Sequence, residues 1–242
     1  MDLVGPKYLA GGFRFYVLDI IDTETHYAGV YPLNDKSSKS IAVALIDFWK
    51  SYSMPDFLQM DNELSFRGSN RYPRSLGLVL RFALSLGITP IFIPPAEPWR
   101  NGIVEKFNHN MLKHFFSTQK FKDLQDTIEK AKEFSAFHNQ NHRYSSQGSK
   151  TPNNLVSKSN KYKLTKEIDL DKSIPLLEGR IVFIRFIRSD NVLKILNTRF
   201  KVSKQLSYTY VIAEVFVEKH VLIVSQDNKV YHVFPFTMPV DW

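Results

Sequence analysis

Three acidic residues lie at the ends of predicted elements, where side chains often reach a ligand. Asp61 directly follows Phe57–Met60, which has the composition of a short buried strand, and Asn62 begins the turn after it. Asp2 lies at the start of a predicted first strand, and Glu105 lies in the first turn of a predicted helix. In open α/β sheets, ligands bind beyond the carboxyl ends of the strands. The positions of Asp2, Asp61 and Glu105 therefore raise the question whether the three carboxylates act together in one site.

Carboxylates that converge repel one another unless cations hold them together. Oxygen ligands in a chain without cysteine favour Mg²⁺ or Mn²⁺ over zinc. Two such ions activate a water or hydroxyl and stabilise the leaving oxygen of a phosphodiester. Spacing alone does not select these three residues from the 24 acids of the chain. Asp19 and Asp22 are rivals of Asp2, and a turn-forming aspartate or a helix-dipole acid is the ordinary alternative at the other two positions.

The composition indicates a folded, basic protein. Of the 242 residues, 43% are hydrophobic, which is enough for a core, and the net charge of +8 fits a polyanionic partner such as nucleic acid. The absence of cysteine excludes disulfides and thiol catalysis. We find no apolar run of about 18 residues and no signal peptide. We therefore expect no membrane partner and a cytoplasmic location, associated with the nucleoid if the source is bacterial.

The order of predicted elements favours an α/β core followed by a small all-β part. Two strands within 13–33 precede a helix capped by Ser37 or Ser38, and strands at 57–60 and 91–93 alternate with helices at 76–86, 101–117 and 122–139. Five short alternating stretches after Arg180 suggest a small barrel. We predict a core over 1–150, a linker over 151–175 and a basic C-terminal barrel over 176–242.

Several stretches resemble the DDE integrases, which include retroviral integrases and related insertion-sequence transposases. The segment from Pro94 through Asn101-Gly102-Ile103-Val104-Glu105 is similar to the motif of their third acid. QMDNELSF (59–66) resembles the second-acid motif, and MDLVGPKYL (1–9) resembles the first-acid strand. FHNQNHRYSSQGSKTP (137–152) resembles the end of their catalytic core, and the tail resembles their basic C-terminal barrel.

This resemblance implies a ribonuclease-H-like core, a mixed sheet with helices on both faces, that binds two Mg²⁺ or Mn²⁺ ions through Asp2, Asp61 and Glu105. It implies hydrolysis of DNA at the ends of a mobile element and transfer of the freed strand into target DNA, by a homo-oligomer assembled on DNA. The implied DNA-binding residues are Arg100, Asn101, Lys106, His109, Lys113 and Arg143.

Three features depart from this pattern or compete with it. Glu63 stands where the family usually has glycine, and the chain starts one residue before Asp2, so we expect a fragment of a longer transposase or a truncated gene. His138 and His142 have a spacing that suits zinc on a helix, but no third ligand is evident. The alternatives are a truncated copy that binds DNA without chemistry, and a ribonuclease-H-like nuclease that cuts without strand transfer.

Overall fold

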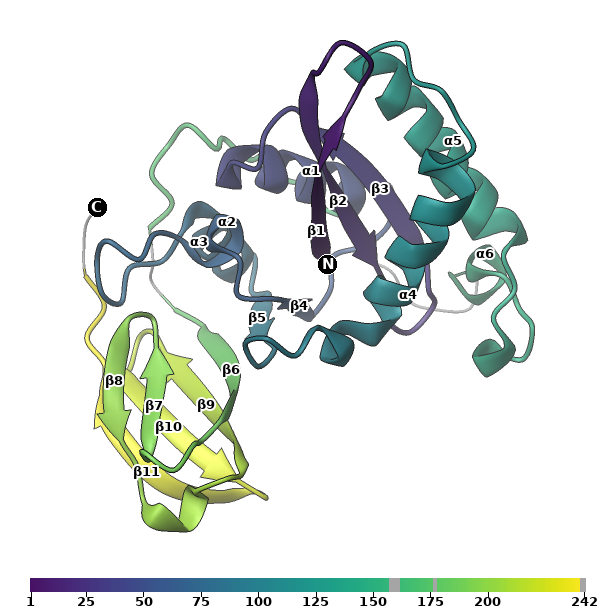
Figure 1. Ribbon diagram of the computed structural model, residues 1–242. Helices are drawn as coiled ribbons and strands as arrows, with labels where there is room; N and C mark the ends of the chain where they lie inside the picture. Colours follow the sequence, from purple (N-terminus) through teal and green to yellow (C-terminus); the bar gives the residue numbers. More distant parts are fainter. Residues whose placement is uncertain (157–161, 176–177, 240–242) are drawn as a thin grey trace. The chain divides into compact units, whose positions relative to one another are not determined.

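The computed structural model describes residues 1–156, 162–175 and 178–239, and the chain divides into two compact units (Figure 1). The first unit comprises Met1–Met54 and Gly102–Glu167, and the second comprises Pro55–Asn101 and Ile168–Trp242. The domain boundaries expected at 150 and 175 stay a prediction. Residues 157–161 of the expected linker, and residues 176–177 and 240–242 of the expected barrel, lie outside the described residues.

The first unit contains a three-stranded antiparallel sheet, in the order β1-β2-β3, and the longer helices of the chain. The predicted strands within 13–33 and the predicted cap at Ser37 are confirmed. The elements are β1 (Asp2–Tyr8), β2 (Arg14–Ile21), β3 (Ala28–Leu33), α1 (Ser38–Ser51), α4 (Gly102–Met111), η2 (Leu112–Phe116), α5 (Leu124–Asn141), η3 (Ser145–Gln147) and α6 (Pro152–Val156).

Helices cover both faces of this sheet. Alternate residues of β2 and β3, including Val17, Ile21 and Val30, pack in one apolar cluster with Phe107 of α4 and with α5. On the other face, Tyr31 contacts the ring of Phe48 in α1. Gly29 allows this approach, because a Cβ at that position would lie 2.9 Å from the Phe48 ring. The period of two in the strands thus separates the two helical layers.

Helix α5 also covers the outer edge of β3. Asn139 accepts a hydrogen bond from the Ala28 N–H at 2.9 Å and donates one to the Ala28 carbonyl at 2.8 Å. Ser135 accepts from the Val30 N–H at 3.1 Å. These side chains satisfy backbone groups that an exposed edge strand would leave open to another chain. The polar residues of the buried α5 face therefore have a structural role.

The second unit contains a six-stranded mixed sheet in the order β11-β10-β9-β6-β5-β4, with a separate β7-β8 hairpin. Strands β4, β5 and β6 are parallel neighbours, whereas β6, β9, β10 and β11 are antiparallel. The elements are β4 (Phe57–Met60), α2 (Leu64–Arg67), α3 (Leu78–Ser85), β5 (Thr89–Phe92), η1 (Pro98–Asn101), β6 (Arg180–Phe186), β7 (Val192–Ile195), β8 (Thr198–Lys201), η4 (Lys204–Leu206), β9 (Tyr210–Phe216), β10 (Val221–Gln226) and β11 (Lys229–Pro235).

The predicted fold class is confirmed, with differences of detail. The chain has mixed sheet, helices and a small all-β C-terminal part. The described residues of the tail form six strands where five were predicted, because Thr198–Lys201 forms β8 after a turn in which Leu196 and Asn197 have positive φ. The predicted helix over 101–117 divides into η1, α4 and the π-helical η2. No helix in the described part of the chain is long and apolar enough to cross a membrane.

The apolar layer under α4 gives a test of the first unit. Phe107 is 1% exposed and Phe137 on α5 is 66% exposed. We expect Phe107→Ala to lower the free energy of unfolding by about 3–5 kcal/mol, because it opens a cavity. Phe137→Ala, the matched control, should change it by less than about 0.5 kcal/mol. Urea denaturation measures both, and equal effects would contradict the observed packing.

Candidate active site

Asp2 lies at the start of β1, where a side chain of α4 holds its carboxylate. Asn108 donates a hydrogen bond from its Nδ2 to Asp2 Oδ2 at 2.6 Å. Asn108 is 7% exposed and belongs to the buried face of α4. This hydrogen bond therefore joins the start of β1 to α4 within a layer that is otherwise apolar.

Asp19 is the cross-strand neighbour of Asp2. The two residues are paired in the β1–β2 register, so their side chains project to the same face of the sheet. Asp19 is fully buried, and within the described residues neither of its carboxylate oxygens has a hydrogen-bond partner. The Oδ1 of Asn108 is also buried without a partner there. These three side chains carry five oxygens, two each from Asp2 and Asp19 and one from Asn108, and the Asn108 amide is the one donor group among them. This arrangement suits a proton or a cation.

The electrostatics of Asp19 follow from this position. Burial raises the pKa of Asp19 well above its usual range, and the charge of Asp2 raises it further. The N-terminal amine and Lys7 oppose these effects. A buried carboxylate without a partner is costly to ionise, so Asp19 is held toward its neutral form.

Asp22, the other rival for the first acid, has a structural role. Its Oδ1 accepts the Glu24 N–H at 2.8 Å within the β2–β3 turn. Its Oδ2 accepts a hydrogen bond from the hydroxyl of Tyr52, which also contacts Thr25. The carboxylate is occupied by the turn and by the end of α1, as expected for an Asx turn.

Glu105 lies in the first turn of α4, three residues before Asn108. Side chains three positions apart on a helix are neighbours, about 5–6 Å apart at Cβ. Because Asn108 reaches Asp2, the turn that carries Glu105 faces the start of β1. Glu105 is partly exposed and has no hydrogen-bond partner within the described residues. Asp2 and Glu105 are therefore brought to the same end of the first unit.

The predicted DNA-binding residues of the first unit lie mostly on the solvent side of α4 and η2. Lys106, His109 and Lys113 are exposed and follow one another at intervals of three and four residues, which places them along one face. Arg143 is also exposed and donates to the Ser149 carbonyl at 2.9 Å. The charges of Lys106, Lys113 and Arg143 are therefore available to an external anion.

Asp61 belongs to the second unit, at the end of β4. Its Oδ1 accepts the Glu63 N–H at 2.9 Å, so the carboxylate shapes the turn that follows the strand. The next residue, Asn62, donates to the Ile93 carbonyl at 2.8 Å and accepts from Arg185 at 2.7 Å. The end of β4 is thereby fixed to the end of β5 and to β6. In the described part of the chain, no three histidine, aspartate or glutamate side chains are gathered as a metal site.

The remaining two predicted DNA-binding residues, Arg100 and Asn101, have partners within the second unit. Arg100 donates to Glu97 at 2.6 Å and lies over the ring of Tyr210 at 4.1 Å, and its hydrogen bond with Glu97 raises its pKa. Asn101 is 7% exposed and accepts from Gln59 at 3.1 Å. Both residues fasten the loop before α4 to neighbouring strands.

The two histidines considered for zinc lie in an aromatic cluster of the first unit. His138 is 4% exposed, stacks on His142 at 4.9 Å and shares a hydrogen bond of 3.1 Å with the Tyr144 hydroxyl. His26 contacts the Tyr144 ring edge-on at 4.1 Å. Burial, together with the neighbouring His142, lowers the pKa of His138 to about 4. The cluster is thus held together by neutral imidazoles.

Asn108 is the positioning residue that the sequence motifs did not single out. Its signal was its spacing, since a position three residues after Glu105 shares the same helix face. Asp19 was considered as a rival ligand, but its burial opposite Asp2 was not expected.

Comparisons with known proteins support an integrase-type core. The family model described as "Integrase core domain" matches residues 86–152, which include Glu105. No curated protein sequence matches the chain. The simian T-cell lymphotropic virus intasome, in complex with PP2A regulatory subunit B56 gamma, superposes with a TM-score of 0.51 and 12% identity over 98% of this chain and 76% of that chain.

Two further solved structures are integrase catalytic cores. The HTLV-2 integrase catalytic core domain in complex with magnesium, in its trimeric form, has 17% identity and a TM-score of 0.47, and the match covers 64% of this chain and 93% of that one. The BIV integrase catalytic core domain has 14% identity and a TM-score of 0.46, covering 65% and 92%. The resemblance of the core to the DDE integrases and transposases is confirmed by the family match and the shared fold.

The buried Asp19 makes a prediction about stability. Asp19→Asn should raise the free energy of unfolding at pH 8 in EDTA by about 1–2 kcal/mol, because an amide avoids the cost of protonating Asp19 at this pH or of burying its charge, and it offers Asp2 a donor. Glu133→Gln, at an exposed position of α5 in the same unit, is the control and should leave stability unchanged. Chemical denaturation measures both. A destabilised Asp19→Asn protein would show that the carboxylate has a stabilising partner.

The histidine cluster predicts a loss of stability in acid. The folded-state pKa of His138 lies below that of an unfolded histidine, so its contribution is complete above about pH 6.5 and falls as the pH drops toward about 4. Between pH 7.5 and pH 5 this amounts to about 2 kcal/mol. His138→Gln should reduce the pH dependence by that amount, and the exposed control His109→Gln should retain it. The measurement is the urea midpoint of unfolding across this pH range. Identical pH profiles for His138→Gln and the unsubstituted protein would contradict the prediction.

Proposed function

We propose that this chain is the catalytic region of a DNA transposase or integrase. It hydrolyses a phosphodiester at the ends of a mobile element and joins the freed 3′-hydroxyl to target DNA. The observation that carries the proposal is the integrase core match over 86–152, in which Glu105 lies one helical turn from the asparagine that holds Asp2. Asp61 completes the set through its resemblance to the second-acid motif.

The donor set fits Mg²⁺ or Mn²⁺. Asp2, Asp61 and Glu105 supply carboxylate oxygens, which hard divalent cations prefer. The acceptors of Asp19 and Asn108 that lack a donor near Asp2 also favour a positive charge there. Two bound ions would activate the attacking oxygen and neutralise charge at the leaving oxygen. HTLV-2 integrase, one of the fold relatives, has been solved with magnesium.

The residues of the chain orient the DNA and the ligands. Asn108 fixes one rotamer of Asp2 through its 2.6 Å hydrogen bond. Lys106, His109 and Lys113 would contact phosphates on the face of α4 and η2 that leads away from Glu105. Arg143 would extend this basic face. Arg100 and Asn101 are weaker members of the set, because an Arg100–phosphate contact must replace the ion pair with Glu97.

Assembly on DNA follows from the chemistry. Strand transfer at two element ends needs two active sites, so we infer a homo-oligomer on DNA in the cytoplasm, at the nucleoid if the source is bacterial. Fold relatives have been solved as dimeric and trimeric forms and as an intasome.

The test is cleavage and strand transfer on a duplex that carries the genomic sequences flanking the gene. The chain, and a second version extended upstream, are assayed with Mg²⁺, Mn²⁺ or EDTA. Asp61→Asn and Glu105→Gln should each lower the rate of both steps by more than about a hundredfold, a loss at least as large as that caused by removing outer partners of metal ligands. Glu133→Gln, an exposed acid on α5, is the control and should keep full activity.

The other outcomes separate the alternatives. Cleavage without joining indicates a ribonuclease-H-like nuclease. DNA binding by both versions without cleavage indicates an inactive copy. Full activity of either acid variant overturns its assignment as a metal ligand.

A further inference from the structure

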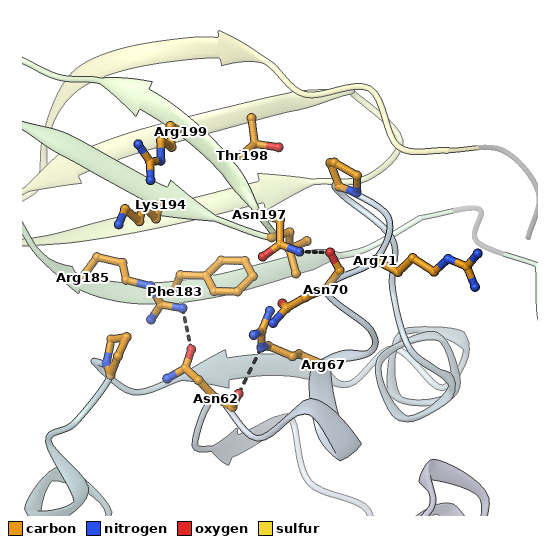
Figure 2. Close-up of a pocket in the computed structure, with 13 residues that line it drawn as sticks. Asn62, Arg67, Asn70, Arg71, Phe183, Arg185, Lys194, Asn197, Thr198 and Arg199 are labelled. Atoms are coloured by element: carbon orange, nitrogen blue, oxygen red, sulfur yellow. Dashed lines mark hydrogen bonds between the residues drawn. The ribbon is translucent and has the colours of Figure 1, made fainter.

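A basic pocket of about 600 Å³ lies within the second unit, and no acidic residue lines it (Figure 2). One wall is formed by the segment after β4, and the other is formed by β6 and the β7–β8 hairpin. The lining residues used below are Asn62, Arg67, Arg71, Arg185, Lys194 and Arg199. Its volume lies in the range of sites that enclose a small molecule or part of a larger ligand.

The loop that forms the first wall is firmly attached. Gly77 donates from its N–H to the Arg67 carbonyl at 3.0 Å and closes the base of the loop. Gly68 has a φ of 100°, and a Cβ there would lie 2.5 Å from the Gly77 nitrogen. The two backbone segments at the base of the loop are therefore in direct contact. Arg74 donates from its N–H to the Leu196 carbonyl at 2.9 Å, which joins the loop to the hairpin. The pocket is therefore a preformed feature of the unit.

Positive charge is concentrated in this pocket. Five of its thirteen lining residues are arginine or lysine, and none is acidic. Lys194 and Arg199 are paired directly across the β7–β8 hairpin, where like charges destabilise a sheet. Both side chains are exposed. An anion that lies against both cations would relieve the repulsion between them.

Arg185 carries positive charge into the floor of the pocket. It lies on the buried face of β6 with Ile181 and Phe183, and it is 9% exposed. It makes three hydrogen bonds, to Ile93, Ile184 and Asn62, although a guanidinium has five N–H donors. Burial, together with the nearby charge of Arg67, lowers the pKa of Arg185 to about 10. Figure 2 shows both guanidinium groups directed toward Asn62.

The chemistry of the lining favours phosphate over a nucleic-acid base. Phe183, the aromatic residue of the lining, is 1% exposed, so its ring offers no stacking surface. Arginine forks and asparagine amides remain as the available donors, and these match phosphate oxygens. The cations run from the buried Arg185 to the exposed Lys194 and Arg199, whereas the Arg71 side chain points away from them (Figure 2). A chain of phosphates can follow such a path from floor to rim, whereas a single phosphate would leave several cations unpaired.

We propose that this pocket binds successive phosphates of a DNA strand, with Arg67 and Arg185 at the inner phosphate and Lys194 and Arg199 at an outer one. Phosphate binding is independent of catalysis. The identity of the strand rests on the proposed function, since Asn62, which contacts both inner arginines, directly follows Asp61. A strand held here would pass next to the proposed second metal ligand.

The first test measures DNA affinity against salt concentration, in EDTA so that catalysis plays no part. The variant Lys194→Gln/Arg199→Gln should weaken binding of a fluorescent duplex about tenfold at 100 mM salt. It should also reduce the slope of log K against log salt by about 1–2, because each lost phosphate contact contributes about 0.9. The control Lys219→Gln/Lys229→Gln removes two exposed charges outside the pocket and should leave the slope nearly unchanged. Equal effects of both double variants would overturn the proposal.

The second test uses the absence of cysteine in the chain. Asn70→Cys introduces a unique thiol at the exposed rim of the pocket, and Lys219→Cys introduces one outside it. DNA should protect the first thiol from maleimide at least fivefold and leave the second reactive. Lack of protection at Asn70→Cys would overturn the proposal. Protection by micromolar tripolyphosphate but not by DNA would assign the pocket to a free polyphosphate and also overturn it.

These results are independent of the cleavage assay. Loss of activity in Asp61→Asn with intact DNA protection at Asn70→Cys supports both proposals. Full activity of Asp61→Asn would contradict the catalytic role of Asp61, but it would not affect the conclusion about DNA binding in the pocket.

Discussion

The hydrogen bond between Asn108 and Asp2 is the contact on which the arrangement of the first unit's polar end depends. It joins the start of β1 to α4 inside a layer that is otherwise held by apolar side chains. Those apolar contacts set how closely the helix approaches the sheet, but they have little directional preference. The polar contact adds direction, because Asn108 and Glu105 share one side of α4. A shift of the helix by one residue would turn both side chains away from the strand.

Crowding of like charge is common to two places in this protein. In the first unit, Asp19 and Asp2 are neighbours across two strands, and Asp19 is buried without a donor. In the second unit, Lys194 and Arg199 oppose one another across a hairpin, and Arg185 is buried near Arg67. Each arrangement costs folding free energy, because like charges repel and burial removes water. Each is relieved by a partner of opposite charge, which is a divalent cation at the acids and phosphate at the bases under our proposals.

Several polar residues that resemble functional groups have structural partners instead. Asp22 closes the β2–β3 turn and receives the Tyr52 hydroxyl, and Asn139 covers the edge of β3. Arg100 is paired with Glu97 and lies over Tyr210. Residue type therefore does not separate a ligand from a turn or edge residue. The separation comes from whether the polar atoms are already satisfied.

The sequence by itself determined the elements and their class, because these depend on local chemistry. Short apolar stretches bounded by polar turns marked β2, β3 and β4, and Ser37, one of two predicted caps, caps α1. The motif around Glu105 indicated the integrase-type core that the comparisons support. Strand β8 escaped notice because four residues with one buried side chain carry almost no periodic signal.

Only the tertiary structure decided which residues became neighbours. Asp19 faces Asp2 because of the β1–β2 register, and Asn108 reaches Asp2 across 106 positions of sequence. Arg67 and Arg185 line one pocket because β6 pairs with β5, although a long helical segment of the chain lies between these two strands. Periodicity fixes the face on which a side chain lies, but it does not specify the partner of that face. Register and packing between distant segments supply that partner.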